Sequence, residues 1–310
     1  MQLIEASQLW YENHGKAMLE KEFPFEVNRI AVGLAGRGSE CFGFDDELSH
    51  DHDCQVGFAL WISSEDERKF GFRLERMYSR LRKEFPPPVI GSTQKSHFGT
   101  IEQGVIVIDD FFRRHLGISG APQSIEQWLH IPEYALAEAV NGRVFRDDQG
   151  FFSSIRQTIR CGMPEDVRLK KIAARAVVMA QSGQYNFMRC IKHGEPGAAR
   201  LFLAEFVRAA GSMIFLLNRQ FAPYDKWLLR AMKDLPRLSF AAEKLNLLLA
   251  GNLPDKSSVE LIESIAQDVI KELALQGISD SREDFLEDHA LSVMSHIRSR
   301  ELKTMHIMEG

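Results

Sequence analysis

The hydrophobic pattern of the chain changes near residue 120, and this change limits the folds that the chain can form. Before it, short apolar and β-branched runs are expected to form strands at about residues 29–34, 52–62 and 105–108. After it, helical periodicity continues almost without interruption, as in residues 198–220. The sequence therefore predicts an α+β fold, with a small mixed-sheet domain over residues 1–120 and an all-helical domain over residues 121–310.

Local signals bound several helices of both domains. Apolar residues at helical spacing predict a helix over residues 6–20. Ser64 is typical of an N-cap for a helix that reaches about residue 84 and is stopped by three prolines. Pro164 is expected at the first position of a later helix, because Glu165 and Asp166 follow it.

Composition excludes several classes of protein. The chain has 310 residues, a net charge of −5 and no uncharged apolar stretch of 18 residues. We therefore expect a cytoplasmic protein without a membrane partner and without an extended nucleic-acid surface. The four cysteines show no C-x-x-C pairing and are interpreted as reduced thiols.

One segment carries a recognisable chemistry. A glycine-rich run that includes Gly38 and Ser39 follows the first strand, and after eleven intervening residues come Asp51 and Asp53. Glycine lets backbone N–H groups approach a triphosphate, and a serine hydroxyl and the start of a short helix can add to them. Two carboxylates two residues apart on a strand share one face, where they can bridge two Mg²⁺ ions about 4 Å apart. The segment predicts phosphoryl transfer chemistry.

Other interpretations of this segment fit less well. A dinucleotide site needs a long helix after the glycines, and here the chain becomes acidic instead. A P-loop needs Gly-Lys followed by Ser or Thr, which is absent. His50 and His52 lack a third soft ligand for zinc. An acidic solvated loop would explain the charge but not the glycines.

The segment and several later ones resemble a bacterial family of uncharacterised nucleotidyltransferase-like proteins in the polymerase-beta superfamily. The resemblance rests on Gly38-Ser39-Glu40-Cys41-Phe42-Gly43, Asp51-His52-Asp53, Asn141-Gly142-Arg143-Val144-Phe145, Asp166-Val167-Arg168-Leu169-Lys170-Lys171, Phe215-Leu216-Leu217-Asn218-Arg219 and Asp284-Phe285-Leu286-Glu287-Asp288-His289, among others. It implies a minimal nucleotidyltransferase domain followed by a helical domain, similar in layout to the aminoglycoside nucleotidyltransferases. It also implies a third carboxylate from a neighbouring strand, for which Asp109 is slightly favoured over Glu102.

Further residues are candidates for nucleotide or acceptor binding, and each also has an ordinary structural interpretation. Arg37 contacts phosphate or is a solvated loop residue. Lys226, with Tyr224 near it, closes over the triphosphate as the resemblance implies, or lies on the surface beside a core tryptophan. Lys170, Lys171 and Arg175 form a basic stripe on a helix, which faces either a cleft or solvent. Tyr185 and Asn186 lie in a loop-like stretch, which either binds a base or the acceptor or packs as a corner between helices.

The expected activity is Mg²⁺-dependent transfer of a nucleoside monophosphate from a nucleoside triphosphate to a hydroxyl group, with release of pyrophosphate. The net charge favours a small-molecule acceptor over RNA. A hydroxyl group of a partner protein is a further candidate acceptor. The alternative is a nucleotide sensor or toxin–antitoxin-like partner that keeps the fold without turnover. A missing third carboxylate would favour that alternative.

Overall fold

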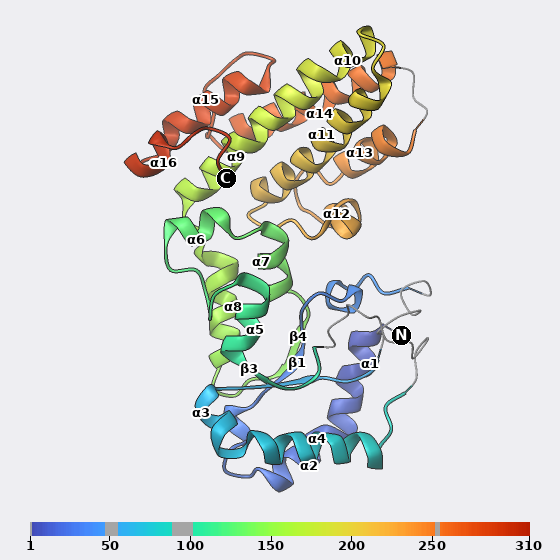
Figure 1. The fold of residues 1–310 in the computed structure, drawn as a ribbon, viewed down its shortest axis with the longest axis vertical. Helices are drawn as coiled ribbons and strands as arrows, with labels where there is room; N and C mark the ends of the chain where they lie inside the picture. The colour runs from blue at the N-terminus through green and yellow to red at the C-terminus, as the bar shows by residue number, and fades with distance from the viewer. Residues whose placement is uncertain (1, 47–54, 89–101, 252–254) are drawn as a thin grey trace. The chain divides into compact units, whose positions relative to one another are not determined.

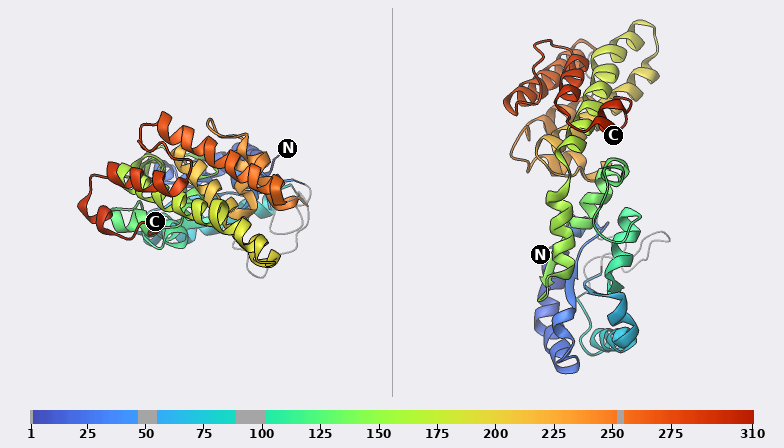
Figure 2. Two further views of the ribbon diagram at one scale, coloured as in Figure 1. Left: turned by 90° about the horizontal axis from the view of Figure 1, so that it is seen from above. Right: turned by 90° about the vertical axis from the view of Figure 1, so that its left-hand side faces the viewer.

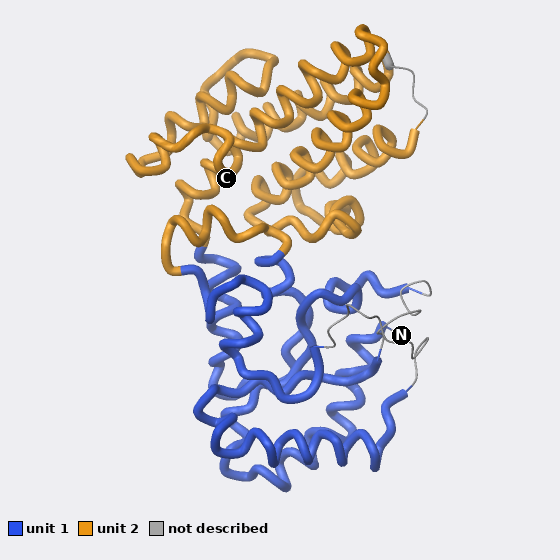
Figure 3. The backbone as a smooth tube through the Cα atoms, viewed as in Figure 1, with its two compact units in different colours: residues 1–122, 135–162 blue, residues 123–134, 163–310 orange. Residues whose placement is uncertain are grey.

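The computed structural model describes residues 2–46, 55–88, 102–251 and 255–310. The chain divides into two compact units, which are coloured separately in Figure 3. Unit 1 comprises residues 1–122 and 135–162, and unit 2 comprises residues 123–134 and 163–310. The compact units divide the chain near the expected residue 120, but residues 135–162 return to unit 1. That the units are separate domains stays a prediction.

Unit 1 is built on a four-stranded mixed sheet with the order β3-β2-β1-β4 (Figure 1). β1 pairs antiparallel with both β2 and β4, and β2 pairs parallel with β3. Gly33, Ala59 and Gly104 lie side by side across three strands. The strands are β1 (Ala31–Leu34), β2 (Ala59–Ile62), β3 (Gly104–Val107) and β4 (Arg143–Arg146). This small mixed sheet, in a chain that is otherwise largely helical, confirms the predicted α+β class.

Helices α1 (Leu3–Trp10), α2 (Lys16–Glu22) and α4 (Phe72–Glu84) bury one face of this sheet. The alternating apolar residues expected for the second strand all join this core; they are Val56, Phe58, Leu60 and Ile62. Side chains that alternate along a strand share a face, so the sequence alternation correctly predicted which residues pack together.

The opposite face of the sheet packs on α5 (Ile108–Leu116) and α8 (Phe151–Gly162). Trp61 stacks on Phe152 with ring centroids 4.0 Å apart, and Phe111 contacts both rings at right angles or nearly so. Since Trp61 lies between Leu60 and Ile62, β2 contributes apolar side chains to both faces. All four of its residues are buried, as in a central strand.

Three local expectations for unit 1 need correction. β2 begins at Ala59 rather than near residue 52. Ser63, not Ser64, caps the next helical segment, and its hydroxyl accepts from the backbone N–H of Asp66 at 3.0 Å. Ile108 starts α5, so Asp109 lies in the first turn of a helix rather than at the end of a strand. Acidic groups there meet the positive end of the helix.

Unit 2 is all-helical in the residues described. Its central element is a continuous rod formed by α9, a π-helical segment (η6) and α10, seen in yellow-green in Figure 2. α9 packs against α11 and α15. The helices are α6 (Ile125–His130), α9 (Glu165–Met179), η6 (Ala180–Phe187), α10 (Met188–Lys192), α11 (Pro196–Leu217), α12 (Asp225–Met232), α13 (Ala241–Ala250), α14 (Asp255–Leu275), α15 (Leu286–His296) and α16 (Arg300–Thr304). α7 (Glu133–Val140) begins in unit 2 and continues into unit 1.

Two expectations for unit 2 also differ from the structure. Pro164 is the N-cap of α9 and not its first residue. Tyr185 and Asn186 lie in η6, within the helical rod, and not in a loop between helices. The amide nitrogen of Asn186 donates to the carbonyl oxygen of Gln181 at 2.8 Å, which stabilises this wider turn.

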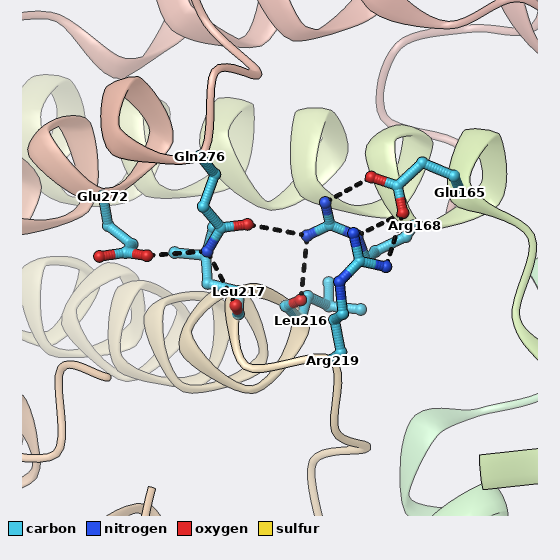
Figure 4. A network of polar contacts seen from close by, with 7 residues as sticks. All are labelled: Glu165, Arg168, Leu216, Leu217, Arg219, Glu272 and Gln276. Carbon is cyan, nitrogen blue, oxygen red and sulfur yellow. Dashed lines mark hydrogen bonds and ion pairs between the residues drawn. The ribbon is translucent and has the colours of Figure 1, made fainter. Parts of the chain in front are cut away.

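A buried arginine stabilises the C-terminal end of α11 (Figure 4). Arg168 is 3% exposed; its guanidinium donates to the carbonyl oxygen of Leu216 at 3.2 Å and forms two hydrogen bonds with Glu165. Gln276 donates to the carbonyl oxygen of Leu217 at 2.8 Å. The last carbonyls of a helix have no partner within it, so this network supplies donors that α11 itself lacks.

In the part of the chain that the structure describes, no helix is both long enough and apolar enough to span a membrane. Cys41, Cys161 and Cys190 are free thiols, and Cys54 lies outside the described residues.

Candidate functional site

The glycine-rich loop follows β1 directly and leads into a short 3-10 helix, η3 (Ser39–Phe42). Gly36 has φ +130°, which favours glycine, and Gly38 is the N-cap of η3. Ser39 is partly exposed on the first position of η3. The strand and tight loop that the sequence predicted are therefore present.

Two residues about a hundred positions further along the chain brace this loop. The side-chain amide of Asn141 donates to the carbonyl oxygen of Gly36 at 2.6 Å and accepts from its N–H at 2.9 Å. The N–H of Gly142 donates to the carbonyl oxygen of Cys41 at 2.7 Å. A side chain at Gly142 would lie 2.1 Å from the carbonyl oxygen of Leu34, so only glycine fits. Both ends of the loop are fixed by the turn that precedes β4.

The sheet topology separates the two candidates for the third carboxylate. β2 and β3 run opposite to β1, so the residues just before them lie at the end of the sheet where β1 enters the glycine loop. Glu102 precedes β3 and lies at this end; a Cβ on Gly36 would be 3.0 Å from its Cγ. Asp109 follows β3 and is exposed at the other end. Glu102, and not Asp109, therefore shares the loop's end of the sheet.

Glu102 belongs to a buried cluster with His115 and Glu138. Glu102 Oε1 is 3.7 Å from His115 Nε2, and Glu138 Oε2 is 3.3 Å from His115 Nδ1. The three residues are 8%, 8% and 7% exposed. Arg114 and Arg37 lie beside the cluster, at 3.8 Å from Glu102 and 3.5 Å from Glu138. A histidine thus lies between two carboxylates directly behind the loop.

Burial dominates the electrostatics of this cluster. It raises the pKa of Glu102, although the interactions with His115, Arg114 and Arg37 act in the opposite direction. Glu102 Oε2 and His115 Nε2 are buried without a hydrogen-bond partner among the described atoms. A buried polar atom without a partner is costly, and such atoms mark strained or functional positions. A carboxylate with a raised pKa is suited to accept a proton.

The remaining predicted residues of this site are placed as follows. Arg37 is exposed, and besides its ion pair with Glu138 its Nη2 donates to the carbonyl oxygen of Arg114 at 3.2 Å. Asp51 and Asp53 lie outside the described residues. Within residues 2–46, 55–88, 102–251 and 255–310, no group of three or more His, Cys, Asp or Glu side chains could hold a metal ion. The predicted metal ligands therefore stay a prediction.

Lys170 and Lys171 do not form an exposed basic stripe, because both are buried in unit 2, at 0% and 2% exposure. The ammonium of Lys170 donates to the carbonyl oxygens of Met305 and His306 at 3.2 and 2.7 Å. That of Lys171 donates to the carbonyl oxygen of Leu129 at 2.7 Å. Burial lowers the pKa of Lys171 to about 8. Hydrogen bonds to the backbone explain both residues without a ligand.

The other candidates of unit 2 lie at its surface. Lys226 is exposed at the start of α12, with its ammonium 4.7 Å from the ring centre of Trp227. Tyr224 precedes α12, is 56% exposed and lines a cavity. The guanidinium of Arg189 lies 4.8 Å from the ring centre of Tyr185. Their expected roles toward nucleotide or acceptor stay predictions.

Sequence reasoning missed Asn141, His115 and Glu138 as parts of this site. The Asn-Gly pair at 141–142 is a turn signal, so a turn there was readable from the sequence. Its contact with a loop 105 positions away was not. His115 and Glu138 lie on helical patterns with no distinguishing spacing, and no sequence signal would have found them.

Comparisons with known proteins add little about activity. The family described as "Domain of unknown function (DUF4037)" matches residues 128–228, about a third of the chain. No curated protein matches in sequence. Among solved structures, a nucleotidyltransferase-like protein from Exiguobacterium sibiricum 255-15 is 10% identical, with 92% of this chain and 88% of that chain covered and a TM-score of 0.35. At this TM-score the likeness decides neither the fold nor the activity of this chain.

Proposed function

We propose that unit 1 is a Mg²⁺-dependent nucleotidyltransferase. An acceptor hydroxyl oxygen forms a bond to the α-phosphorus of a nucleoside triphosphate, the bond from that phosphorus to the β-phosphate bridging oxygen breaks, and pyrophosphate leaves. The observation that carries the proposal is Glu102, a buried carboxylate that lies directly behind a braced glycine loop.

The glycine loop serves to hold the triphosphate. Gly36 and Gly38 allow a phosphate to approach the backbone closely, and Ser39 adds a hydroxyl donor at the partly exposed start of η3. The contacts from Asn141 and Gly142 keep this loop in one conformation. A preorganised donor set is what phosphoryl transfer requires of a protein.

Asp51 and Asp53 would hold the Mg²⁺ ions. When bound, the ions neutralise the phosphate charge and orient the reacting oxygens. The fit of this chain to the metal rests on two facts: the segment with both aspartates joins the loop to β2, and Glu102 Oε2 is a buried carboxylate oxygen without a hydrogen-bond partner at the same end of the sheet. Hard oxygen ligands are those that Mg²⁺ prefers.

Glu102 accepts the proton of the acceptor hydroxyl as that oxygen attacks phosphorus. Its raised pKa makes it a better base than an exposed carboxylate. His115 and Glu138 lie behind it and orient it, while Arg37 and Arg114 balance the negative charge of the cluster. We assign this role to Glu102 in preference to Asp109, because Asp109 lies at the other end of β3.

The test is calorimetric titration of each nucleoside triphosphate, with Mg²⁺, into the full chain. We expect Mg²⁺-dependent binding to the wild type and its loss in the Asp51→Ala/Asp53→Ala variant. Glu65→Ala/Glu67→Ala is the matched control: it removes two carboxylates of the same unit from a segment outside the site and should bind like the wild type.

The outcomes of this test distinguish the enzyme from the nucleotide sensor. Loss of binding only in the aspartate variant supports the site, and release of pyrophosphate from the bound triphosphate supports the enzyme. Binding without pyrophosphate release in the presence of a metabolite extract would favour the nucleotide sensor. No binding of any triphosphate to folded wild type would contradict the proposal.

A further inference from the structure

A cavity of about 480 Å³ lies within unit 2, and it does not depend on the proposed transferase activity. α9, α11, the start of α12 and residues 132–134 form its walls. Much of the wall is apolar, with Val178, Ala209 and Leu228 among the contributing side chains. A mainly apolar cavity of this size with a few convergent polar groups is typical of a small-molecule site.

A buried carboxylate lines the cavity. Glu133 is 7% exposed, and the hydroxyl of Ser212 lies 2.9 and 3.0 Å from its two oxygens. Arg175 Nη2 donates to Glu133 Oε1 at 3.3 Å, and Arg175 Nε donates to the Ser212 hydroxyl at 2.8 Å. The hydroxyl has one proton to donate, so Ser212 and Arg175 together satisfy only part of the acceptor capacity of this carboxylate. Glu133 is held in a fixed position with room to accept from a ligand.

The charges on the cavity wall favour a cation. The wall has three carboxylates, from Glu133, Glu205 and Asp225, and two guanidinium groups. Each guanidinium already pairs with a carboxylate: Arg175 with Glu133 at 3.3 Å, and Arg208 with Asp225 at 3.1 Å. Glu205 has no ion-pair partner within the residues that the structure describes. An anionic ligand would have to displace one of these carboxylates, whereas a cation meets an excess of negative charge.

Two tyrosines contribute to the same cavity. Tyr134 is 46% exposed and Tyr224 is 56% exposed, so both rings have free surface. The face of a tyrosine ring attracts an ammonium group, and the ring also packs against apolar groups.

From the buried Glu133, the excess of carboxylates and the exposed tyrosine rings, we infer that this cavity binds a small organic monocation. The ligand is an amine whose apolar or aromatic body contacts Val178, Ala209 and Leu228. Its ammonium group donates to Glu133 and lies against a tyrosine ring.

The test uses three probes of the same size in calorimetric titrations with the full chain at pH 7: 2-phenylethylamine, the neutral 2-phenylethanol and the anion phenylacetate. We expect the amine to bind, the alcohol to bind more weakly and phenylacetate not to bind. Glu133→Gln should weaken amine binding about tenfold or more, since a hydrogen bond to a charged acceptor is lost. Glu126→Gln is the matched control, because Glu126 is an exposed carboxylate of the same unit outside the cavity.

A second variant keeps the test decisive if Glu133→Gln does not fold. Tyr224→Leu changes an exposed side chain and should weaken amine binding by roughly threefold through loss of the aromatic face. The inference is overturned if the amine fails to bind at concentrations up to about 10 mM, or if phenylacetate binds as tightly as the amine. Wild-type affinity in both folded variants would also overturn it.

Discussion

Unit 2 buries the cations Arg168, Lys170 and Lys171 and gives each of them backbone carbonyl acceptors. Unit 1 leaves several buried polar atoms without a hydrogen-bond partner among the described atoms, including one each of Glu102, His115, Tyr11, Trp61 and Arg156. In the described part of unit 2, no buried side-chain nitrogen or oxygen lacks such a partner.

The difference shows which buried charges have a structural role. A buried charge with its hydrogen bonds satisfied stabilises the fold around it, and its removal exposes the cost of the partners left behind. A buried polar atom without a partner lowers stability, so it persists where function needs it. By this criterion the buried cations Arg168, Lys170 and Lys171 of unit 2 are structural, and the cluster beside the glycine loop is the part of unit 1 for which we propose a function.

The largest expected effect is on turnover. Glu102→Gln should lower the rate of pyrophosphate release roughly 10²-fold or more, because the proposed proton acceptor is lost. The assay is Mg²⁺-dependent release from each triphosphate with water or a metabolite extract as acceptor. Asp109→Asn changes the other candidate carboxylate and should keep the wild-type rate. Loss of activity in Asp109→Asn alone would transfer the role to Asp109.

The same variant should not lose stability. The pKa of Glu102 is raised in the folded chain, so its contribution to stability is present at low pH and is lost as pH rises through that pKa. Glutamine cannot ionise, so the variant does not lose this stability as pH rises. At pH 8 its melting temperature should be equal to or above that of the wild type. A lower melting temperature would mean that Glu102 is structural.

Arg168→Met should produce the largest loss of stability, about 2 kcal/mol in the free energy of unfolding, because Glu165 and the carbonyl of Leu216 each lose a charged donor. Both acceptors keep Arg219 as a partner. Denaturant unfolding of the full chain measures it. Arg200→Met, at an exposed position of α11, is the control and should change stability little. A loss below about 1 kcal/mol would show that satisfied buried charges in unit 2 are not structural.

The pH dependence of stability tests whether the ammonium of Lys171 is buried in unit 2. Burial lowers its pKa to about 8 in the folded chain, from about 10.5 for an exposed lysine. Between these values the unfolded chain binds more protons, so stability rises with pH, by about 1.5 kcal/mol from pH 8 to 9.5. Lys171→Met should remove this rise, and the exposed Lys271→Met should retain it. Identical pH profiles for wild type and Lys171→Met would contradict the burial of this ammonium.

The smallest expected effect concerns the loop. Gly36→Ala should destabilise unit 1 by about 1 kcal/mol or more, because φ is +130° and the new Cβ would be 3.0 Å from Cγ of Glu102. Gly117→Ala introduces the same methyl group at φ +75° with nothing within 4 Å. Triphosphate binding should weaken in Gly36→Ala and not in Gly117→Ala. If both variants weaken triphosphate binding equally, the glycine loop beside Glu102 does not form the triphosphate site.

Local sequence information was enough for much of the fold. Helical and alternating periodicity correctly predicted α11, α14 and the apolar residues of β2, because side-chain spacing along one element depends only on nearby positions. The glycine loop after β1 was predicted for the same reason. Element boundaries were less accurate: β2 begins at Ala59 and α5 at Ile108, since the ends of elements depend on partners elsewhere.

The sequence by itself determined the α+β class, three of the four strands, and a glycine loop followed by an Asp-x-Asp pair. It missed β4, which lies at Arg143–Arg146 within the range expected to be all-helical. Only the tertiary structure decided that Asn141 holds Gly36, that Glu102 rather than Asp109 lies at the loop's end of the sheet, and that Lys170 and Lys171 are buried. The physical reason is that each of these facts joins residues far apart in the chain. Spacing within an element is a local property, whereas strand direction, burial and hydrogen-bond partners exist only once the elements have packed.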